Sequence, residues 1–229
     1  MALDPSPSPV PTVRSRPGGR LRPLIAGIIA LGMVSIVWQF TQFSRRSSFS
    51  PSWDRDLAPL VMQGGDPYIR ALMRTISASE SNSSQPYSIL YGGDHFQDLS
   101  QHPDRCVPIV TGINEGDCTT AAGRYQFIAS TWEEKAAFYH PQPSNFFFWH
   151  RYSFEPEYQD QVVYRWLNDP QAWGVDIAAL LREGKIQEVL RILSPTWTSL
   201  GDGIESNDMT ELLPQIYQEL LQQELENRK

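Results

Sequence analysis

An uncharged, apolar stretch near the amino terminus constrains the fold of this chain more than any other feature. No charged residue occurs from residue 23 to 44, and residues 24–40 read LIAGIIALGMVSIVWQF. In a helix, about twenty such residues span the roughly 30 Å hydrocarbon layer of a membrane. Trp38 and Phe40, at one end of the run, suit the interfacial belt. The sequence therefore predicts one transmembrane helix over residues 23–44.

The flanks of this segment predict its orientation. Residues 1–22 are rich in proline and serine, a composition typical of a disordered arm, and residues 45–65 are expected to form a linker. Four arginines precede the apolar run and two follow it, which favours a cytoplasmic amino terminus. The folded domain, residues 66–229, then lies outside the cytoplasmic membrane, in a periplasm or an extracellular space. The alternative is a cleaved signal peptide, although no small-residue cleavage site follows the run.

The charge distribution excludes one class of partner. The net charge is −7, and residues 47–229 carry 13 basic and 25 acidic side chains. A domain that binds phosphate backbones needs a positive surface, so nucleic acid is not an expected partner. The four histidines show neither an HExxH motif nor a helical i, i+4 pair, and we expect no metal site and no cofactor.

Periodic apolar residues predict a mainly helical domain of the α+β class. Asp66-Pro67 is a typical helix start, and the apolar residues that follow recur with helical spacing. Ser130-Thr-Trp-Glu133 matches a capping box for another helix. Three more helices are indicated by the apolar sets Val162/Val163/Trp166/Leu167, Ile186/Val189/Leu190/Leu193 and Leu213/Ile216/Tyr217/Leu220.

Between these helices the sequence predicts a small β region. Residues 87–99 combine β-forming residues with a Gly92-Gly93 turn, which indicates a hairpin or small sheet. Cys106 and Cys118 stand twelve positions apart. Two free buried thiols are the alternative for a cytosolic protein, but an exported domain favours a disulfide that closes a local loop.

Glu80 is the best candidate for a catalytic group. It lies eleven residues after Ile69, which returns it to within about 20° of the same helix face, at the expected helix end. Partial burial and the negative end of the helix dipole should both raise its pKa. A carboxylic acid that keeps its proton near neutral pH is what cleavage of a glycosidic bond requires. A solvated glutamate at a frayed helix end is the alternative from geometry alone.

Five segments resemble the phage lambda lysozyme family in order and spacing, across roughly residues 66–205. They are YIRALMRTISASESN (68–82), PYSILYGGDHFQDLSQHP (86–103), TTAAGRYQFIASTW (119–132), SFEPEYQD (153–160) and SPTWTSLG (194–201). The resemblance implies a lysozyme-like fold and lytic transglycosylase activity on peptidoglycan. Such enzymes cleave the β-1,4 bond between N-acetylmuramic acid and N-acetylglucosamine and leave a 1,6-anhydro end.

The resemblance also implies roles for single residues. The family's catalytic glutamate maps onto Glu80, and its glutamine and tyrosine of the glycan groove map onto Gln126 and Tyr125. We add Tyr87, Gly123, Arg124 and Trp197 as candidates for substrate binding, although Arg124 could bridge elements and Trp197 could fill the core. The Phe146–Trp149 run is expected to be a core or lid segment.

Three departures keep other functions open. Ser81 replaces the glycine that usually follows the catalytic glutamate in the lambda lysozyme family. Ser88 stands where the lambda enzyme has an aspartate after the tyrosine. Residues 105–118 match poorly, and we expect a loop near the groove rim.

A hydrolytic muramidase could use Asp94 or Asp98 as a second carboxylate. A catalytically inactive wall-binding module is the alternative from another class. In either case the partners are peptidoglycan strands and, through residues 23–44, the membrane.

Overall fold

The computed structural model describes residues 57–110, 112, 114–142, 152–201 and 209–227. The predicted arm, the anchor at residues 23–44 and the Phe146–Trp149 run lie outside these ranges. Within them, no helix is long and apolar enough to cross a membrane. The chain divides into two units, and the second, Pro51–Lys229, contains every element described below.

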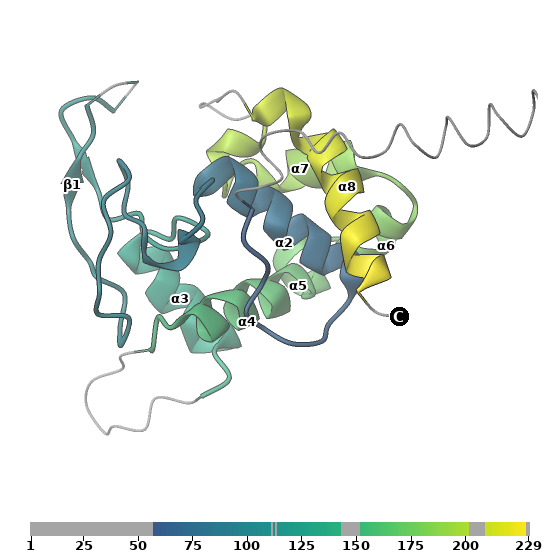
Figure 1. Cartoon of the computed structure of the whole chain (residues 1–229), viewed down its shortest axis with the longest axis horizontal. Helices are drawn as coiled ribbons and strands as arrows, with labels where there is room; N and C mark the ends of the chain where they lie inside the picture. Colours follow the sequence, from purple (N-terminus) through teal and green to yellow (C-terminus); the bar gives the residue numbers. More distant parts are fainter. Residues whose placement is uncertain (1–56, 111, 113, 143–151, 202–208, 228–229) are drawn as a thin grey trace, which may run out of the picture. The chain divides into compact units, whose positions relative to one another are not determined.

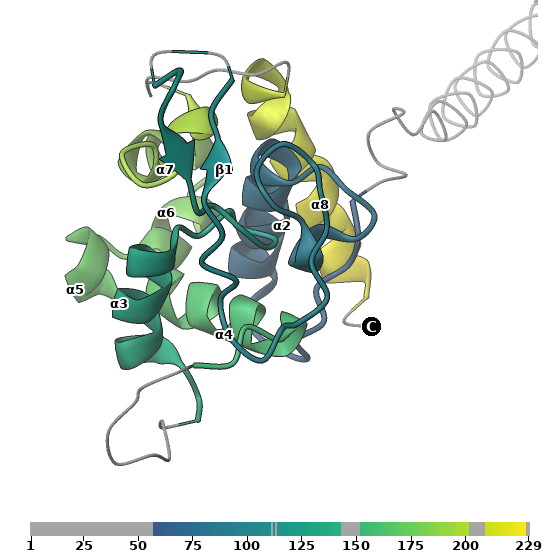
Figure 2. The ribbon, with the colours of Figure 1, turned by 90° about the vertical axis from the view of Figure 1, so that its left-hand side faces the viewer.

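The second unit is mainly helical with a small antiparallel sheet, as the sequence predicts. In chain order its elements are α2 (Pro67–Glu80), η3 (Pro86–Ser88), β1 (Val107–Pro108), β2 (Cys118–Thr119), α3 (Ala129–Tyr139), α4 (Pro156–Leu167), α5 (Pro170–Trp173), α6 (Ile177–Arg182), α7 (Ile186–Leu193), η4 (Thr198–Leu200), η5 (Thr210–Leu212) and α8 (Leu213–Glu226). Figures 1 and 2 show α2 surrounded by α4, α6 and α8, all of which contact it.

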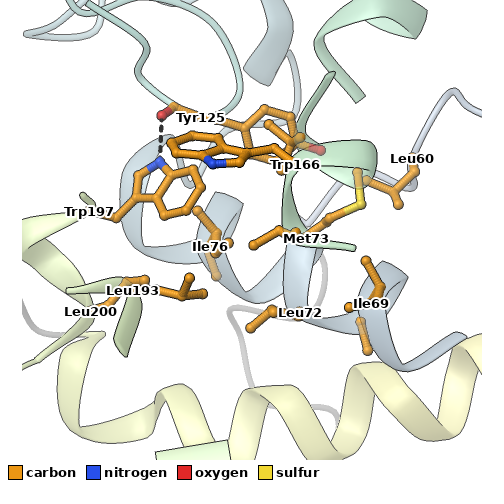
Figure 3. Packing of buried hydrophobic residues seen from close by; sticks show 14 of the residues in the cluster. Leu60, Ile69, Leu72, Met73, Ile76, Tyr125, Trp166, Leu193, Trp197 and Leu200 are labelled. Atoms are coloured by element: carbon orange, nitrogen blue, oxygen red, sulfur yellow. Dashed lines mark hydrogen bonds between the residues drawn. The ribbon is translucent and has the colours of Figure 1, made fainter. Parts of the chain in front are cut away.

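Helix α2 begins and packs as its sequence indicates. The side chain of Asp66 accepts a hydrogen bond from the amide of Tyr68, and Pro67 occupies the first turn. The apolar stripe, Ile69, Leu72, Met73 and Ile76, has no exposed surface. Figure 3 shows this stripe facing Trp166, Leu193 and Trp197. The apolar sets that predict α4, α7 and α8 are likewise buried, so hydrophobic burial holds these helices around α2.

One of two local predictions is wrong. Helix α3 begins after Ile128 without a side-chain cap, and the amide of Ala129 donates instead to the hydroxyl of Thr120 at 3.0 Å. The capping box at Ser130–Glu133 therefore does not form. The expected hairpin over residues 87–99 is present in a short form. Ile89 pairs antiparallel with His95, and the amide of Gly93 donates to the carbonyl of Leu90 at 3.0 Å in the turn between them.

The regular sheet lies further along the chain. Strand β1 pairs with β2 through Val107–Thr119 and Pro108–Cys118, at the end of the molecule away from α6 and α8 (Figure 1). Cys106 and Cys118 form a disulfide with their Cα atoms 5.5 Å apart. The disulfide prediction is confirmed, and the segment expected to be an irregular loop is a hairpin pinned at its base.

The folded domain begins before residue 66. Leu57, Leu60 and Met62 are buried in the same core as α2, although the sequence places them in a linker. The carbonyl and amide groups of residues 58–62 also bond to side chains inside the domain. The boundary prediction was wrong because it followed the proline content around Pro59 and not these spaced apolar residues. We call residues 57–62 the N-terminal strap.

Candidate active site

Glu80 is the last residue of α2, and its side chain is half-buried. The separation of eleven positions from Ile69 places Glu80 on the buried side of the helix, at the carboxyl end. Its neighbour Ser81 ends the helix with φ −124°, a conformation open to any residue. The serine that replaces glycine here is therefore accommodated without strain. Its hydroxyl turns inward, onto the carbonyl of Ser77 at 3.1 Å.

The carboxyl group of Glu80 is bonded to a residue distant in sequence. The hydroxyl of Ser199, in η4, donates a hydrogen bond to Oε1 of Glu80. In return, the hydroxyl of Ser79 donates to the carbonyl oxygen of Ser199 at 3.1 Å. The hydroxyl of Thr210 donates to the same carbonyl oxygen at 2.9 Å. Side-chain hydrogen bonds from each segment to the other thus join the end of α2 to η4.

A tight turn over residues 122–127 carries the second candidate for substrate contact, Gln126. Gly123 has φ +74°, and Gln126 has φ +46°, a left-handed conformation that a residue other than glycine rarely adopts. The side-chain amide of Gln126 donates to the carbonyl of Gly123 at 2.9 Å, and this side chain is half-buried. Among the motif residues of the turn, Gln126 alone keeps part of its side chain exposed. Strained backbone of this kind often marks a functional position.

Trp197 ties the turn to the η4 segment. Its indole N–H donates to the carbonyl oxygen of Tyr125 at 3.0 Å, drawn as a dashed line in Figure 3. The indole is 4% exposed and packs 5.3 Å from the ring of Trp166, centroid to centroid. Trp197 therefore occupies the core, the alternative that the sequence left open, and does not offer a face to a sugar. It places Gln126 and Ser199 in neighbouring segments.

The remaining motif residues form a buried polar network under the turn. Asp160 in α4 has no exposed surface and accepts hydrogen bonds from the hydroxyls of Tyr87 at 2.8 Å and Tyr125 at 2.6 Å. Burial raises the pKa of both phenols, so both remain protonated donors. The guanidinium of Arg124 donates to the Tyr87 hydroxyl at 2.9 Å and to the carbonyl of Ala58 at 2.6 Å. The network connects the turn, α4 and the N-terminal strap.

This placement corrects the expected roles of four residues. Arg124 and Tyr125 have no exposed surface, and Tyr87 is 9% exposed with its hydroxyl in the network. Gly123 is buried against Phe154 and Gln159. Side chains enclosed in this way cannot touch a soluble glycan in this structure, so these residues position the turn. The sequence could not show this, because a Gly-Arg-Tyr turn reads the same whether its side chains face inward or outward.

Comparison with known proteins gives the family. A model of the endolysin family matches residues 70–221. The chain belongs to the endolysin family. The matched range contains α2, the turn, the buried network and η4, and membership makes the chain a peptidoglycan-cleaving enzyme.

Solved structures show the fold. Bacteriophage lambda lysozyme complexed with a chitohexasaccharide superposes with a TM-score of 0.50 at 22% identity, over 69% of this chain and 97% of that one. A second structure of lysozyme from bacteriophage lambda gives a TM-score of 0.46 at 19% identity, over 71% of this chain and 97% of that one. No curated protein matches the sequence. The predicted lysozyme-like fold is confirmed by the first of these structures.

In this endolysin-family chain, the two candidate second carboxylates lie on exposed backbone. Asp98 accepts a hydrogen bond from the amide of Ser100 at 2.9 Å, and its bonds with Ser100 lower its pKa. It organises a turn, as an Asp two residues before a bonded amide commonly does. Asp94 is exposed, and its backbone carbonyl accepts a bond from Leu90 at 2.7 Å. Neither side chain is held as Glu80 is held by Ser199.

Two residues that hold the candidate site together were not predicted from the sequence. Ser199 and Asp160 both lie inside the segments that resemble the lambda lysozyme family, but neither received a role. Ser199 is 119 residues from its partner Glu80, and Asp160 is 35 residues from Tyr125. Their only signal in the sequence was membership of these segments. Among the described residues no group of three or more His, Cys, Asp or Glu side chains could hold a metal ion.

Proposed function

We propose that this chain is a peptidoglycan lytic transglycosylase in which Glu80 is the general acid and then the general base. The observation that carries the proposal is the half-buried carboxyl of Glu80, held by Ser199 at the end of a buried helix. An oriented, half-buried carboxyl is what proton transfer to a glycosidic oxygen requires. The bond cleaved is the β-1,4 bond between N-acetylmuramic acid and N-acetylglucosamine.

The reaction needs only one carboxyl group. Glu80 gives its proton to the glycosidic oxygen as the bond from that oxygen to C1 of the muramic acid breaks. The C6 hydroxyl oxygen of the same sugar then bonds to C1, and its proton returns to Glu80. The product carries a 1,6-anhydro ring, and water is not consumed. Because nucleophile and electrophile belong to one sugar, the step gains from proximity.

The positions of Asp94 and Asp98 favour this route over hydrolysis. A hydrolytic muramidase needs a second carboxylate placed to attack C1 or to activate water. Asp98 is engaged with Ser100, and Asp94 projects from an exposed turn. A catalytic carboxylate must be fixed with its oxygens available to the substrate, whereas Asp98 is fixed in a turn by Ser100 and no described contact fixes the side chain of Asp94.

Product analysis tests the proposal. The full chain, purified in detergent, is incubated with soluble glycan strands, and the products are analysed by mass spectrometry. We expect anhydro ends, which are lighter than hydrolysed ends by one water. Glu80→Gln should reduce the rate at least about a hundredfold, since it removes the acid. Glu226→Gln is the matched control, because Glu226 is the last residue of α8 as Glu80 is of α2.

Each other outcome selects an alternative. Reducing ends that disappear in Asp94→Asn or Asp98→Asn would indicate a hydrolytic muramidase. Binding to strands without cleavage by the wild-type chain would indicate an inactive wall-binding module. Full activity of Glu80→Gln would contradict the assignment of Glu80.

We further propose that residues 23–44 anchor the enzyme, with the catalytic domain on the outer side of the cytoplasmic membrane. The Cys106–Cys118 disulfide supports this location, because disulfides persist in oxidising compartments. The anchor would restrict cleavage to nearby wall, which suits wall remodelling. After alkaline extraction the full chain should stay with the membranes, and protease added outside the cytoplasm should degrade its domain. Release of the chain by alkali would contradict the anchor.

A further inference from the structure

Ser199 contacts the end of α2 through two separate groups. Its hydroxyl donates to Oε1 of Glu80, and its carbonyl oxygen accepts the hydroxyl of Ser79 at 3.1 Å. Ser79 and Glu80 are consecutive, so two adjacent residues of α2 bond to one residue of η4 in opposite directions. The hydroxyl of Thr210, next to α8, holds the same carbonyl oxygen at 2.9 Å. The backbone of Ser199 is thereby fixed from two elements while its side chain reaches the carboxyl.

We propose that Ser199 is the positioning residue for Glu80 and fixes the orientation of its carboxyl group. The inference rests on the proposed function of Glu80. A hydroxyl that donates to Oε1 uses that oxygen as an acceptor. The carboxyl group is thereby held in one orientation relative to η4.

The same hydrogen bond serves both halves of the reaction. After Glu80 has given up its proton, it is an anion at the carboxyl end of a helix, where the helix dipole disfavours negative charge. A hydroxyl that donates to the anion compensates for this effect, because hydrogen bonds to charged groups are stronger than neutral ones. When the C6 hydroxyl is then deprotonated, the carboxyl is already oriented to accept its proton. Ser199 acts without touching the sugar.

The network around Trp197 keeps Ser199 in place. Trp197 lies two residues before Ser199 and is fixed by its bond to Tyr125 and by packing against Trp166. Leu200, directly after Ser199, is buried in the same core. A residue flanked by two core side chains has little freedom to move its hydroxyl, so the bond to Glu80 is preorganised.

The test compares three serine and threonine variants of the full chain in detergent on soluble glycan strands. Ser199→Ala removes the donor, and Ser199→Thr keeps a hydroxyl. Ser194→Ala is the matched control, because Ser194 lies five residues before Ser199 and its hydroxyl donates to the backbone carbonyl of Arg191, at 2.9 Å, and not to Glu80. We expect kcat of Ser199→Ala to fall about tenfold or more with KM changed less than about twofold. We expect Ser199→Thr to stay within about threefold of wild type.

A purely structural role predicts a different pattern. It would lower the melting temperature and the active fraction of Ser199→Ala, and the apparent fall in kcat would disappear once the rate is divided by the folded fraction measured by circular dichroism. The proposal is overturned if Ser199→Ala keeps the kcat of Ser194→Ala, or if Ser199→Thr is as slow as Ser199→Ala. Both variants are compared at temperatures well below their melting transitions.

A double variant separates this inference from the proposed function. If Ser199 acts through Glu80, adding Ser199→Ala to Glu80→Gln should lower the residual rate less than about twofold, since residues that act as a unit are not additive. An inactive Glu80→Gln together with an unaffected Ser199→Ala would refute only the positioning role. An active Glu80→Gln would refute the proposed function itself.

Discussion

The indole N–H of Trp197 and the carbonyl oxygen of Tyr125 lie 3.0 Å apart, across 72 residues of sequence. This bond joins the two motif segments of the site, because Gln126 follows Tyr125 and Ser199 follows Trp197 by two residues. Both partners are buried, so the bond is made in a low-dielectric core where an unpaired carbonyl would be costly. The geometry of the exposed groups is therefore determined by contacts that the substrate never reaches.

Asp160→Asn should destabilise the domain strongly. The carboxylate accepts from two phenols and from the amides of Val61 and Met62, at 2.8 and 3.1 Å. An amide places N–H groups where donors already point, and it leaves the buried Arg124 without a nearby anion. We expect a loss of about 3 kcal/mol in the free energy of unfolding, measured by urea titration.

The control for Asp160 is Asp104→Asn, an exposed aspartate whose φ of +45° asparagine also tolerates. It should change the free energy of unfolding by less than about 0.5 kcal/mol. Equal losses in the two variants would show that the network does not stabilise the domain. A specific loss in Asp160→Asn should be accompanied by faster proteolysis within the strap.

The sequence predicted the helices because their apolar residues recur at helical spacing and must face a core. It also predicted the position of Glu80, half-buried at the end of α2, since the helix period carries the buried stripe to that end. The disulfide followed from the export argument. These features depend on residues close together in the chain, or on a single physical constraint.

The features that the sequence did not reveal depend on distant partners. Arg124 and Tyr125 turn inward because Asp160 and the strap supply their hydrogen bonds, and nothing within the AAGRYQ motif indicates that. The sequence of the strap is typical of a linker, and only the structure shows that its carbonyl and amide groups bond to side chains in the domain. The contact of Ser199 with Glu80 likewise could not be predicted, because it forms only when η4 packs against the end of α2.

Gly123→Ala should be much more damaging than a comparable substitution at an open turn. A Cβ at Gly123, where φ is +74°, would lie 2.3 Å from Oε1 of Gln159 and 2.7 Å from Cζ of Phe154. That oxygen also accepts the amide of Arg124 at 2.9 Å, so moving it breaks a second contact. We expect a loss of at least about 2 kcal/mol in the free energy of unfolding.

Gly92→Ala provides the matched control for Gly123. Its φ is +82°, and a Cβ there meets nothing within 4 Å. Only the backbone conformation is then penalised, at about 1 kcal/mol. If Gly92→Ala were as destabilising as Gly123→Ala, the close approach of Gln159 and Phe154 would not be the reason for glycine at 123.

Removal of the disulfide should lower stability without abolishing the fold. Cys106 and Cys118 close a loop with a sequence separation of 12 residues, and in the chain-entropy account such a loop contributes about 3 kcal/mol. The double variant Cys106→Ser/Cys118→Ser should therefore melt several degrees lower than the oxidised chain. Adding a reductant should lower the melting temperature of wild type and leave that of the double variant unchanged. A wild type insensitive to reductant would contradict the prediction.

His102 should make the domain less stable as the pH falls below about 6.5. Its Nε2 lies 2.7 Å from the carbonyl of Phe127, and its Nδ1 accepts the amide of Asp104 at 3.1 Å, so the buried ring fits its neutral form. Burial lowers the pKa of His102 from 6.5, although the Phe127 carbonyl opposes this shift. The unfolded chain then binds a proton at a higher pH than the folded domain. Stability is complete above about pH 6.5 and falls by up to about 1.4 kcal/mol per pH unit below it, until the folded pKa is reached.

Urea titrations between about pH 8 and pH 5 measure this dependence. His102→Gln keeps a side-chain donor but cannot titrate, so its stability should decline less over the acidic part of the range. His95→Gln, the same substitution at an exposed histidine, is measured as the control for replacing histidine by glutamine. The carboxyl groups contribute equally to the pH dependence of all three proteins. Only the difference between the curves therefore reports on His102. Identical curves for wild type and His102→Gln would mean that the buried ring accepts a proton without cost, which its contact with the Asp104 amide argues against.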